Sequence, residues 1–88
     1  MTDQIVIEFP QSDYPIRVIA DSHAELREQV LQVVRRHDPM FEESSVEMVK
    51  SREGTYCSVR MKILAIGEAQ LQALHEDLKL NPLVKMVL

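Results

Sequence analysis

The sequence predicts an α+β domain in which two helices cover one face of a four-stranded antiparallel sheet. Several short segments alternate apolar and polar residues, which is the period of half-buried strands. Two longer segments carry apolar residues at helical spacing. Together they run strand, helix, strand, strand, helix, strand, which is the βαββαβ order of the ferredoxin-like fold. Right-handed crossovers then place both helices on the same face, with the first and third strands in the centre.

The length and composition indicate one small globular domain. A chain of 88 residues leaves room for a single core, and 45% apolar with 27% charged residues is ordinary for such a domain. We expect an N-terminal arm or edge strand over residues 1–13, because Pro10 and Pro15 limit ladder pairing there. The single ferredoxin-like domain is expected over residues 14–88. The net charge of −4 disfavours a general phosphate-binding protein.

The first half of the chain predicts one strand and one helix. Residues 14–20 alternate between two faces, as a half-buried strand does. A helix is expected from about residue 22 to residue 37, where apolar residues recur at helical spacing. Ser22 and Glu25 fit a capping box, in which each side chain accepts a hydrogen bond from the backbone N–H of the other residue. Pro39 prevents the helix from continuing.

The second half predicts a hairpin, a helix and a last strand. Strands over residues 46–50 and 55–64 join around residues 51–54, where Gly54 supplies the positive φ that a tight loop needs. A helix over residues 67–79 is ended by Asn81 and Pro82, and residues 83–88 close the chain as a strand. The combined pattern predicts these core residues: Val18, Leu26, Val30, Val33, Val59, Met61, Leu74, Leu78 and Met86.

The single cysteine, Cys57, excludes an internal disulfide and indicates a reducing compartment. It lies in a strand-like alternation between Tyr56 and Ser58, so we expect a buried, unreactive thiol. No apolar run approaches the roughly 20 residues that span a bilayer. The N-terminus lacks a basic leader followed by an apolar core. We therefore expect a cytoplasmic protein with no membrane contact.

The chain resembles the YbeD-like family of small bacterial proteins of unassigned function. The resemblance is carried, over nearly the whole chain, by Glu8-Phe-Pro10, Arg36-His-Asp-Pro39, Ser51-x-x-Gly54-x-Tyr56-x-Ser58-Val59 and Val84-Lys-Met-Val-Leu88. It implies an ACT-like, ferredoxin-type fold, a bacterial cytosolic source and a likeness of shape to the regulatory domains of amino-acid biosynthetic enzymes. It also implies a weak link to lipoate metabolism.

One face of the predicted sheet is a candidate interaction face. Six of the ten Lys and Arg residues fall on predicted strands or their hairpin, and the acids concentrate in helices and loops. Two interpretations stay open: a solvated face that keeps the protein soluble, or a docking surface for an acidic protein partner or a second copy of the chain. Ile19 and Val87 are expected beside the charges and favour a partly apolar contact. The candidate residues are Arg17, Tyr56, Ser58, Arg60, Lys62 and Lys85.

Two other functions are weighed against protein binding. An RNA-binding sheet of this topology needs two or three aromatic residues on its open face, and only Tyr56 is expected there, which disfavours nucleic acid. An ACT-like amino-acid sensor would bind its ligand at the turn formed by Asp21, Ser22 and His23, where a helix N-terminus offers free N–H groups to a carboxylate. That turn has no glycine to let a ligand approach the backbone, so sensing is the alternative hypothesis.

Catalysis and metal binding are both disfavoured. His23, His37 and His75 are far apart in the sequence, with no cysteine or carboxylate at ligand spacing. The only two glycines, Gly54 and Gly67, cannot form a phosphate-cradling loop. We therefore predict a non-enzymatic regulatory or interaction domain that uses no cofactor and no metal.

Overall fold

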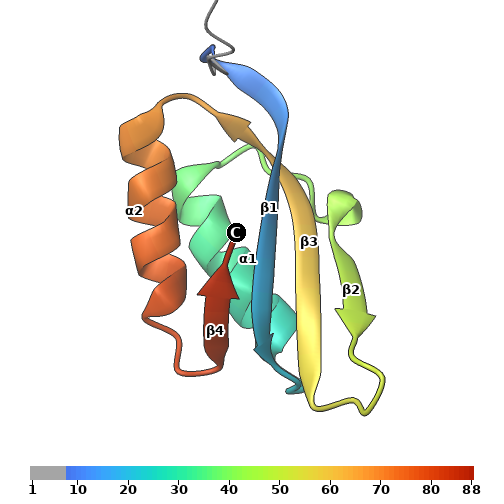
Figure 1. Ribbon diagram of the computed structural model, residues 1–88. Coiled ribbons are helices and arrows are strands. Elements are labelled where there is room, and N and C mark those ends of the chain that lie inside the picture. Colours follow the sequence, from blue (N-terminus) through green and yellow to red (C-terminus); the bar gives the residue numbers. More distant parts are fainter. Residues whose placement is uncertain (1–7) are drawn as a thin grey trace, which may run out of the picture.

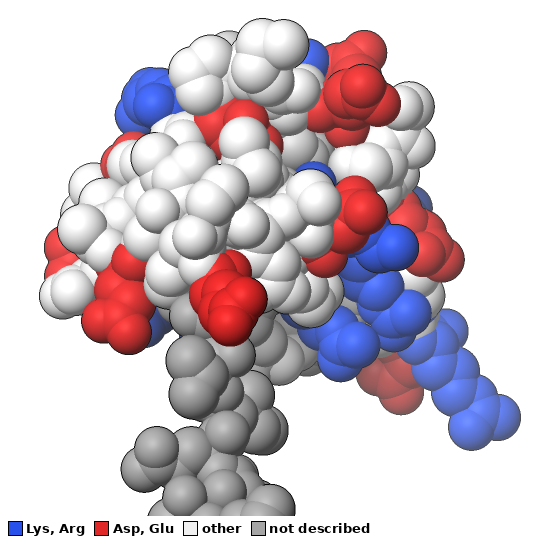
Figure 2. All heavy atoms as spheres, turned by 90° about the horizontal axis from the view of Figure 1, so that it is seen from above, with Lys and Arg blue, Asp and Glu red and all other residues white. Residues whose placement is uncertain are grey.

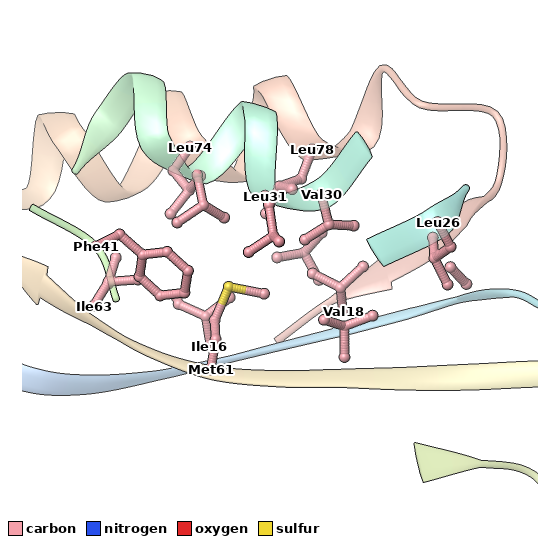
Figure 3. Packing of buried hydrophobic residues seen from close by; sticks show 14 of the residues in the cluster. Ile16, Val18, Leu26, Val30, Leu31, Phe41, Met61, Ile63, Leu74 and Leu78 are labelled. Atoms are coloured by element: carbon pink, nitrogen blue, oxygen red, sulfur yellow. The ribbon is translucent and has the colours of Figure 1, made fainter. Parts of the chain in front are cut away.

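The computed structural model describes residues 8–88, and their arrangement is the predicted one (Figure 1). The four strands lie in the order β2-β3-β1-β4, and all neighbours are antiparallel. Figure 3 shows both helices on the same side of the strands. The βαββαβ prediction, with the first and third strands in the centre, is confirmed. The elements are β1 (Gln11–Asp21), α1 (Leu26–His37), the 3-10 turn η1 (Glu43–Ser45), β2 (Glu47–Lys50), β3 (Tyr56–Ala65), α2 (Glu68–Lys79) and β4 (Val84–Val87).

The core lies between the helices and the inner face of β1 and β3. Val18 pairs with Val59 and Ile16 with Met61 across these two strands, and all four side chains are buried. Figure 3 shows Ile16, Val18 and Met61 pointing toward the helices. The helices contribute the buried residues Leu26, Val30, Leu31, Val34, Leu74 and Leu78. The predicted register of β3 is confirmed, and so is the burial of Cys57. Of the other predicted core residues, Val33 is half-buried at the margin.

The predicted register of the last strand is wrong. Met86, predicted in the core, is 49% exposed, whereas Val87, expected beside the charges of the open face, is 9% exposed and belongs to the core. The reason is an irregularity in the pairing of β4 with β1: Met86 lies opposite Ile19, but Val84 lies opposite Ala20, so Lys85 is an extra residue. A slip of one residue moves every following side chain to the other face of the sheet.

The predicted capping box is also wrong, and α1 begins at Leu26 rather than at residue 22. The N–H of Ser22 donates to the carbonyl of Thr55 at 3.0 Å, which holds this residue in an extended conformation beside the sheet. Nδ1 of His23 accepts the N–H of Glu25 at 3.0 Å instead. The histidine therefore accepts the N–H that the capping box predicts for the serine, and the N-cap residue of α1, Glu25, has no side-chain cap hydrogen bond.

The N-terminal half of β1 has no neighbouring strand on the side where β4 pairs with the C-terminal half. This explains how a central strand tolerates Pro15. Arg17 exchanges two backbone hydrogen bonds with Leu88, and the N–H of Asp21 donates to Leu83, so β4 borders only the second half of β1. Successive N–H groups point to opposite sides of a strand. The missing N–H of Pro15 therefore lies on the unpaired side, where proline blocks the addition of another strand.

The hairpin loop and the N-terminal arm were also predicted from the sequence. The hairpin loop contains Gly54 at φ 75°, as predicted, and its N–H donates to Ser51 at 2.9 Å. The predicted arm falls partly on residues 1–7, outside the described residues; within the described part, β1 begins at Gln11. Across residues 8–88, no helix is long and apolar enough to cross a membrane.

Candidate functional site

The sheet surface opposite the helices is the candidate site, and we call it the open face. Directly paired residues of antiparallel strands share a face, so the pairing arranges the open-face side chains in rows that cross the strands. One row is mostly apolar: Val49 lies opposite Ser58, Ser58 opposite Ile19, and Ile19 opposite Met86. We call Val49, Ile19 and Met86 the apolar row. The neighbouring row runs Glu47, Arg60, Arg17 and Leu88.

Three cations gather on this face, and we call Arg17, Arg60 and Lys62 the cationic cluster. Arg17 lies directly opposite Arg60, and Lys62 follows two residues along β3. All three are exposed, and none forms an ion pair with any of residues 8–88. In Figure 2, Lys and Arg side chains gather along the lower right of the molecule. Like charges opposite each other in a sheet are destabilising. Glu47, opposite Arg60 on β2, is the acid of this row, and it forms no ion pair with the cluster.

The cationic cluster borders a shallow hollow on the open face. The hollow has a volume of about 490 Å³, within the range of small-molecule sites but open to solvent. Besides the three cations, it is lined by Pro15, Ile16, Ser45, Glu47, Met61 and Leu88. Because the side chains of Ile16 and Met61 point into the core, Pro15 and Leu88 supply the apolar side chains beside the cations. Together they would suit an anionic group attached to an apolar body.

The other residues predicted for the interaction face, Tyr56, Ser58 and Lys85, differ from the cluster because they have a partner or no charge. Nζ of Lys85 lies 3.3 Å from Oδ2 of Asp21, so this predicted interaction residue is an exposed ion-pair partner. Asp21 lies opposite Tyr56 and therefore belongs to the open face. Tyr56 is exposed, and Ser58 sits between members of the apolar row.

The turn formed by Asp21, Ser22 and His23, which is the candidate amino-acid site, is divided between the two faces of the sheet. Asp21 is on the open face, but Ser22 and His23 line a hollow of about 320 Å³ on the helix side, beside Lys50. The hydroxyl oxygen of Ser22 is buried and makes no hydrogen bond within the described part of the chain. The corner thus offers one unused hydroxyl and one cation, while Nδ1 of His23 is engaged by the helix.

A polar cluster that our reading of the sequence missed lies at the C-terminal end of α1. Asp38 is 5% exposed, and its carboxylate accepts the N–H of Leu64 at 3.0 Å and that of Met40 at 3.2 Å. It joins the end of the helix to the end of β3. The residue follows a predicted helix and precedes Pro39, which is a signal of a helix end but not of a partner 26 residues away.

Two side chains of α2 extend this cluster. Oδ2 of Asp77 lies 3.0 Å from Nε2 of His37 and 3.7 Å from the guanidinium of Arg36. Gln70 donates to the carbonyls of His37 and Leu64 and accepts the N–H of Ile66 at 2.7 Å. Residues 36–38, part of the segment that carried the family resemblance, therefore join α1, α2 and β3. No group of three or more His, Cys, Asp or Glu side chains arranged for a metal occurs among residues 8–88.

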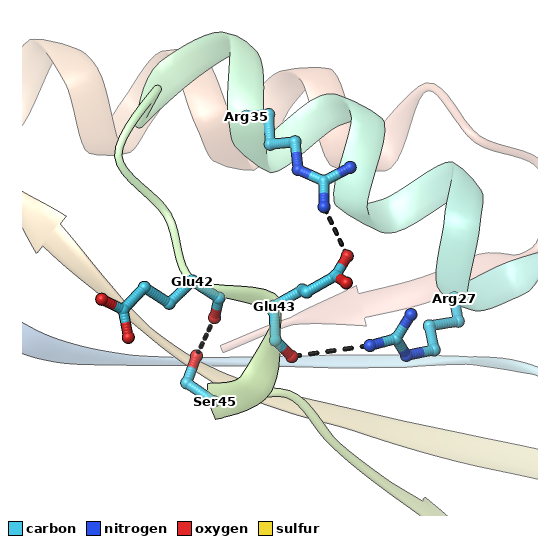
Figure 4. A network of polar contacts seen from close by, with 5 residues as sticks. All are labelled: Arg27, Arg35, Glu42, Glu43 and Ser45. Carbon is cyan, nitrogen blue, oxygen red and sulfur yellow. Dashed lines mark hydrogen bonds and ion pairs between the residues drawn. The ribbon is translucent and has the colours of Figure 1, made fainter.

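A second set of contacts fixes the segment before β2 (Figure 4). The guanidinium of Arg35 pairs with the carboxylate of Glu43 at 2.5 Å, and Arg27 donates to the carbonyl of the same residue at 3.5 Å. The hydroxyl of Ser45 donates to the carbonyl of Glu42 at 2.8 Å. These contacts engage cations of α1 on the helix side and leave the cationic cluster on the other side untouched.

Comparison with known proteins places the chain in a family. Residues 4–88 match the family described as "Protein of unknown function (DUF493)". The chain belongs to this family. It is 42% identical to a UPF0250 protein of Azotobacter vinelandii, over all of both chains. It is 43% identical to a UPF0250 protein of Hahella chejuensis, over 93% of this chain and 89% of the relative. The resemblance to small bacterial proteins of unassigned function is confirmed.

Solved structures agree with the fold. The solution structure of protein HP0495 from H. pylori superposes with a TM-score of 0.77 at 14% identity, covering 99% of this chain and 90% of the other. The ACT domain from the GTP pyrophosphokinase of Chlorobium tepidum superposes with a TM-score of 0.60 at 16% identity, covering 86% and 96%. At such identities the likeness shows the fold alone, and that fold is ACT-like.

Proposed function

We propose that this protein is a non-enzymatic interaction domain that binds an acidic protein partner on the open face. The observation that carries the proposal is the cationic cluster, three cations without ion pairs among residues 8–88, beside the apolar row. The whole chain has a net charge of −4, so the cluster is a local exception to the charge of the molecule. An acidic partner complements it.

A solvated surface explains this arrangement less well than a docking surface does. Solubility is served by mixed charges without apolar neighbours, whereas Met86 is 49% exposed and Leu88 is 54% exposed next to the cations. The pairing of Arg17 with Arg60 also lacks a stabilising role within the chain. An interface with a partly apolar centre and a charged rim would account for both the exposed apolar residues and the facing arginines.

RNA fits this face poorly. Tyr56 is its only aromatic side chain within residues 8–88, whereas stacking platforms use two or three. The carboxylates of Glu47 and Asp21 lie on the same face as the cations, where they would repel a phosphate backbone. Both observations favour a protein partner, whose carboxylates are spaced individually, over a continuous phosphate backbone.

The test is affinity capture from a lysate of the source bacterium with quantitative mass spectrometry. The bait is the full chain, either wild type or with Arg60→Glu and Lys62→Glu together. A matched control carries Arg52→Glu and Lys79→Glu, two exposed cations outside the open face, and has the same net charge. We expect one acidic protein to be captured by wild type and control but lost with the open-face pair. The purified partner should bind less tightly as salt increases.

Equal capture by all three baits would overturn the proposal. Tyr56→Ala separates protein from RNA, because removing the one aromatic abolishes base stacking but spares an electrostatic protein contact. Capture of RNA that depends on Tyr56 would therefore contradict the protein-binding proposal.

A second candidate function is amino-acid sensing at the hollow beside Ser22. The observation that favours it is the unpartnered hydroxyl of Ser22 next to Lys50 in a volume of about 320 Å³. A bound amino acid would raise the melting temperature by mass action. A thermal-shift screen of the common amino acids at millimolar concentration tests this function, with Lys50→Gln as the control. If the open face is the only site, no amino acid changes the melting temperature.

A further inference from the structure

We infer that the segment of the partner that docks on the open face is an acidic amphipathic helix lying across the strands. The inference rests on the proposed function and specifies the shape of the partner. It follows from three properties of the open face: the direction of the apolar row, the position of the cationic cluster beside it, and the absence of backbone groups for a partner to bond.

The apolar row has the length and width of one helix stripe. It extends across the sheet from Val49 on β2 through Ile19 on β1 to Met86 on β4, with Ser58 of β3 between Val49 and Ile19. Three strand spacings of about 4.8 Å make it about 14 Å long, which equals about nine or ten residues of helix at 1.5 Å rise. It is only one side chain wide, because the next row along the strands is charged. A helix with apolar residues at every third or fourth position matches such a row.

The cationic cluster lies along one side of this row. Arg17 and Ile19 are two residues apart on β1, as are Arg60 and Ser58 on β3, so the two rows are about 7 Å apart. A helix is about 10 Å across with its side chains. Acidic residues on one flank of a helix seated on the apolar row would therefore reach the guanidinium groups. The hollow of about 490 Å³ between the cations has room for such a carboxylate side chain.

The other side of the apolar row does not favour acidic residues in the partner helix. Lys85 is already paired with Asp21 at 3.3 Å, and Tyr56 is neutral. A helix that carried acids on both flanks would place one set against the carboxylate of Asp21. The partner helix is thus acidic on one flank only.

An extended segment fits less well because its backbone would stay unsatisfied. Side chains cover the open face, so a strand laid on it would find few backbone partners for its N–H and C=O groups. The free part of β1 is no substitute, since Pro15 lacks the N–H that pairing requires there, and the outer edges of β2 and β4 border the open face without lying on it. A helix forms its own backbone hydrogen bonds and needs only side-chain contacts.

The experiment uses three synthetic peptides of about 14 residues, long enough for some helix in water, and the full chain labelled with ¹⁵N. The first peptide has a leucine stripe at helical spacing with glutamates on one flank. The second replaces each glutamate by glutamine. The third has the composition of the first, but leucine and glutamate alternate, as suits a strand. Binding is followed by amide chemical-shift changes and repeated from about 0.05 M to about 0.3 M salt.

We expect the first peptide to bind at least tenfold more tightly than either of the others, to shift residues of the apolar row and cationic cluster, and to weaken as salt increases. Ile19→Gln with Met86→Gln should abolish this binding. A matched control, Ile66→Gln with Leu80→Gln, changes two exposed apolar residues that are not on the strand rows of the open face and should leave it intact.

Tighter binding of the alternating peptide, equal binding of the glutamine peptide, or shifts confined to the helices would overturn the inference. Self-association of the free chain through the open face in sedimentation experiments would also overturn it, because a second copy would then be the occupant. If no peptide binds while cellular capture still depends on Arg60 and Lys62, the helix inference fails and the proposed function stands. If capture does not depend on Arg60 and Lys62, the proposed function and the helix inference both fail.

Discussion

The cluster at the end of α1 and the cationic cluster on the open face place charged groups in opposite situations. Asp38 is buried and accepts two backbone N–H groups, and Asp77 pairs with two side chains of α1. Arg17 and Arg60 are exposed and face each other, and neither forms an ion pair with any of residues 8–88, although Glu47 lies opposite Arg60 on β2. Removing a charge of the first kind leaves buried donors unpaired, whereas removing one of the second kind relieves repulsion. The comparison therefore separates charges that hold the fold from charges available for a partner.

The largest effect should come from Asp38→Ala. The substitution leaves the N–H groups of Leu64 and Met40 without their acceptor, and hydrogen bonds to a charged group stabilise by about 1.5–3 kcal/mol. We expect a loss of about 2–3 kcal/mol in the free energy of unfolding, with a melting temperature lower by about 10–20 °C. Urea denaturation monitored by circular dichroism measures this.

Asp38→Asn is the control for that prediction. It keeps one oxygen acceptor of similar geometry and should recover part of the lost stability. Partner capture at a temperature where the variant is folded should be unchanged, because Asp38 is only 5% exposed and offers a partner little surface. A loss of less than about 0.5 kcal/mol, the size of an ordinary surface effect, would show that the cluster does not hold the fold.

A smaller loss is expected for Gln70→Ala, which tests whether the cluster joins α2 to the rest of the molecule. Its amide donates at 3.0 Å to His37 and at 2.9 Å to Leu64 and accepts the N–H of Ile66 at 2.7 Å. One of these bonds is partly buried and two are exposed, so a loss of about 1 kcal/mol is expected. Gln72→Ala is the matched control on the same helix, since Gln72 makes one exposed contact, with Glu76 at 3.3 Å. Equal losses for the two variants would contradict the prediction.

The sequence made the open face predictable but not the cluster at the end of α1. Period-two alternation places Arg60 and Lys62 on one face of β3, and the fold order brings Arg17 beside them. Asp38 was missed because its acceptor role depends on Leu64, which only the packed fold brings near. A polar residue after a helix looks the same in sequence whether it caps the helix, faces solvent or bonds a distant strand.

The last strand and the start of α1 were also predicted wrongly, because local sequence patterns do not reveal contacts with distant segments. Residues 83–88 are nearly all apolar, so no alternation fixes which of them face the core, and the extra residue Lys85 decides it. Ser22 and Glu25 fit a capping pattern, but the N–H of Ser22 bonds to Thr55 from the far side of the hairpin. In both places a contact distant in sequence overrides a local signal.

On the open face, Arg17→Gln should raise the free energy of unfolding slightly. The substitution removes the repulsion between Arg17 and Arg60, and cross-strand pairs contribute about 0.2–1 kcal/mol. Lys62→Gln is the control, because Lys62 lies opposite Pro15 and has no facing cation. Both variants should weaken partner capture, but only the first should stabilise the chain. Destabilisation by Arg17→Gln would show that this arginine holds the fold, contrary to the comparison.

The smallest effect concerns the pH dependence of stability and lies away from both clusters, on α2. Burial, and then the nearby charge of Lys79, lower the pKa of His75 below the ordinary histidine value of 6.5. The unfolded chain therefore binds this proton more readily than the folded chain, so stability from this group is lost as the pH falls below about 6.5. His75→Gln should flatten the dependence of unfolding free energy on pH between neutral and mildly acidic conditions. Lys79→Gln should flatten it less, because burial remains. If the wild type and His75→Gln lose stability in parallel on acidification, the loss arises from other groups.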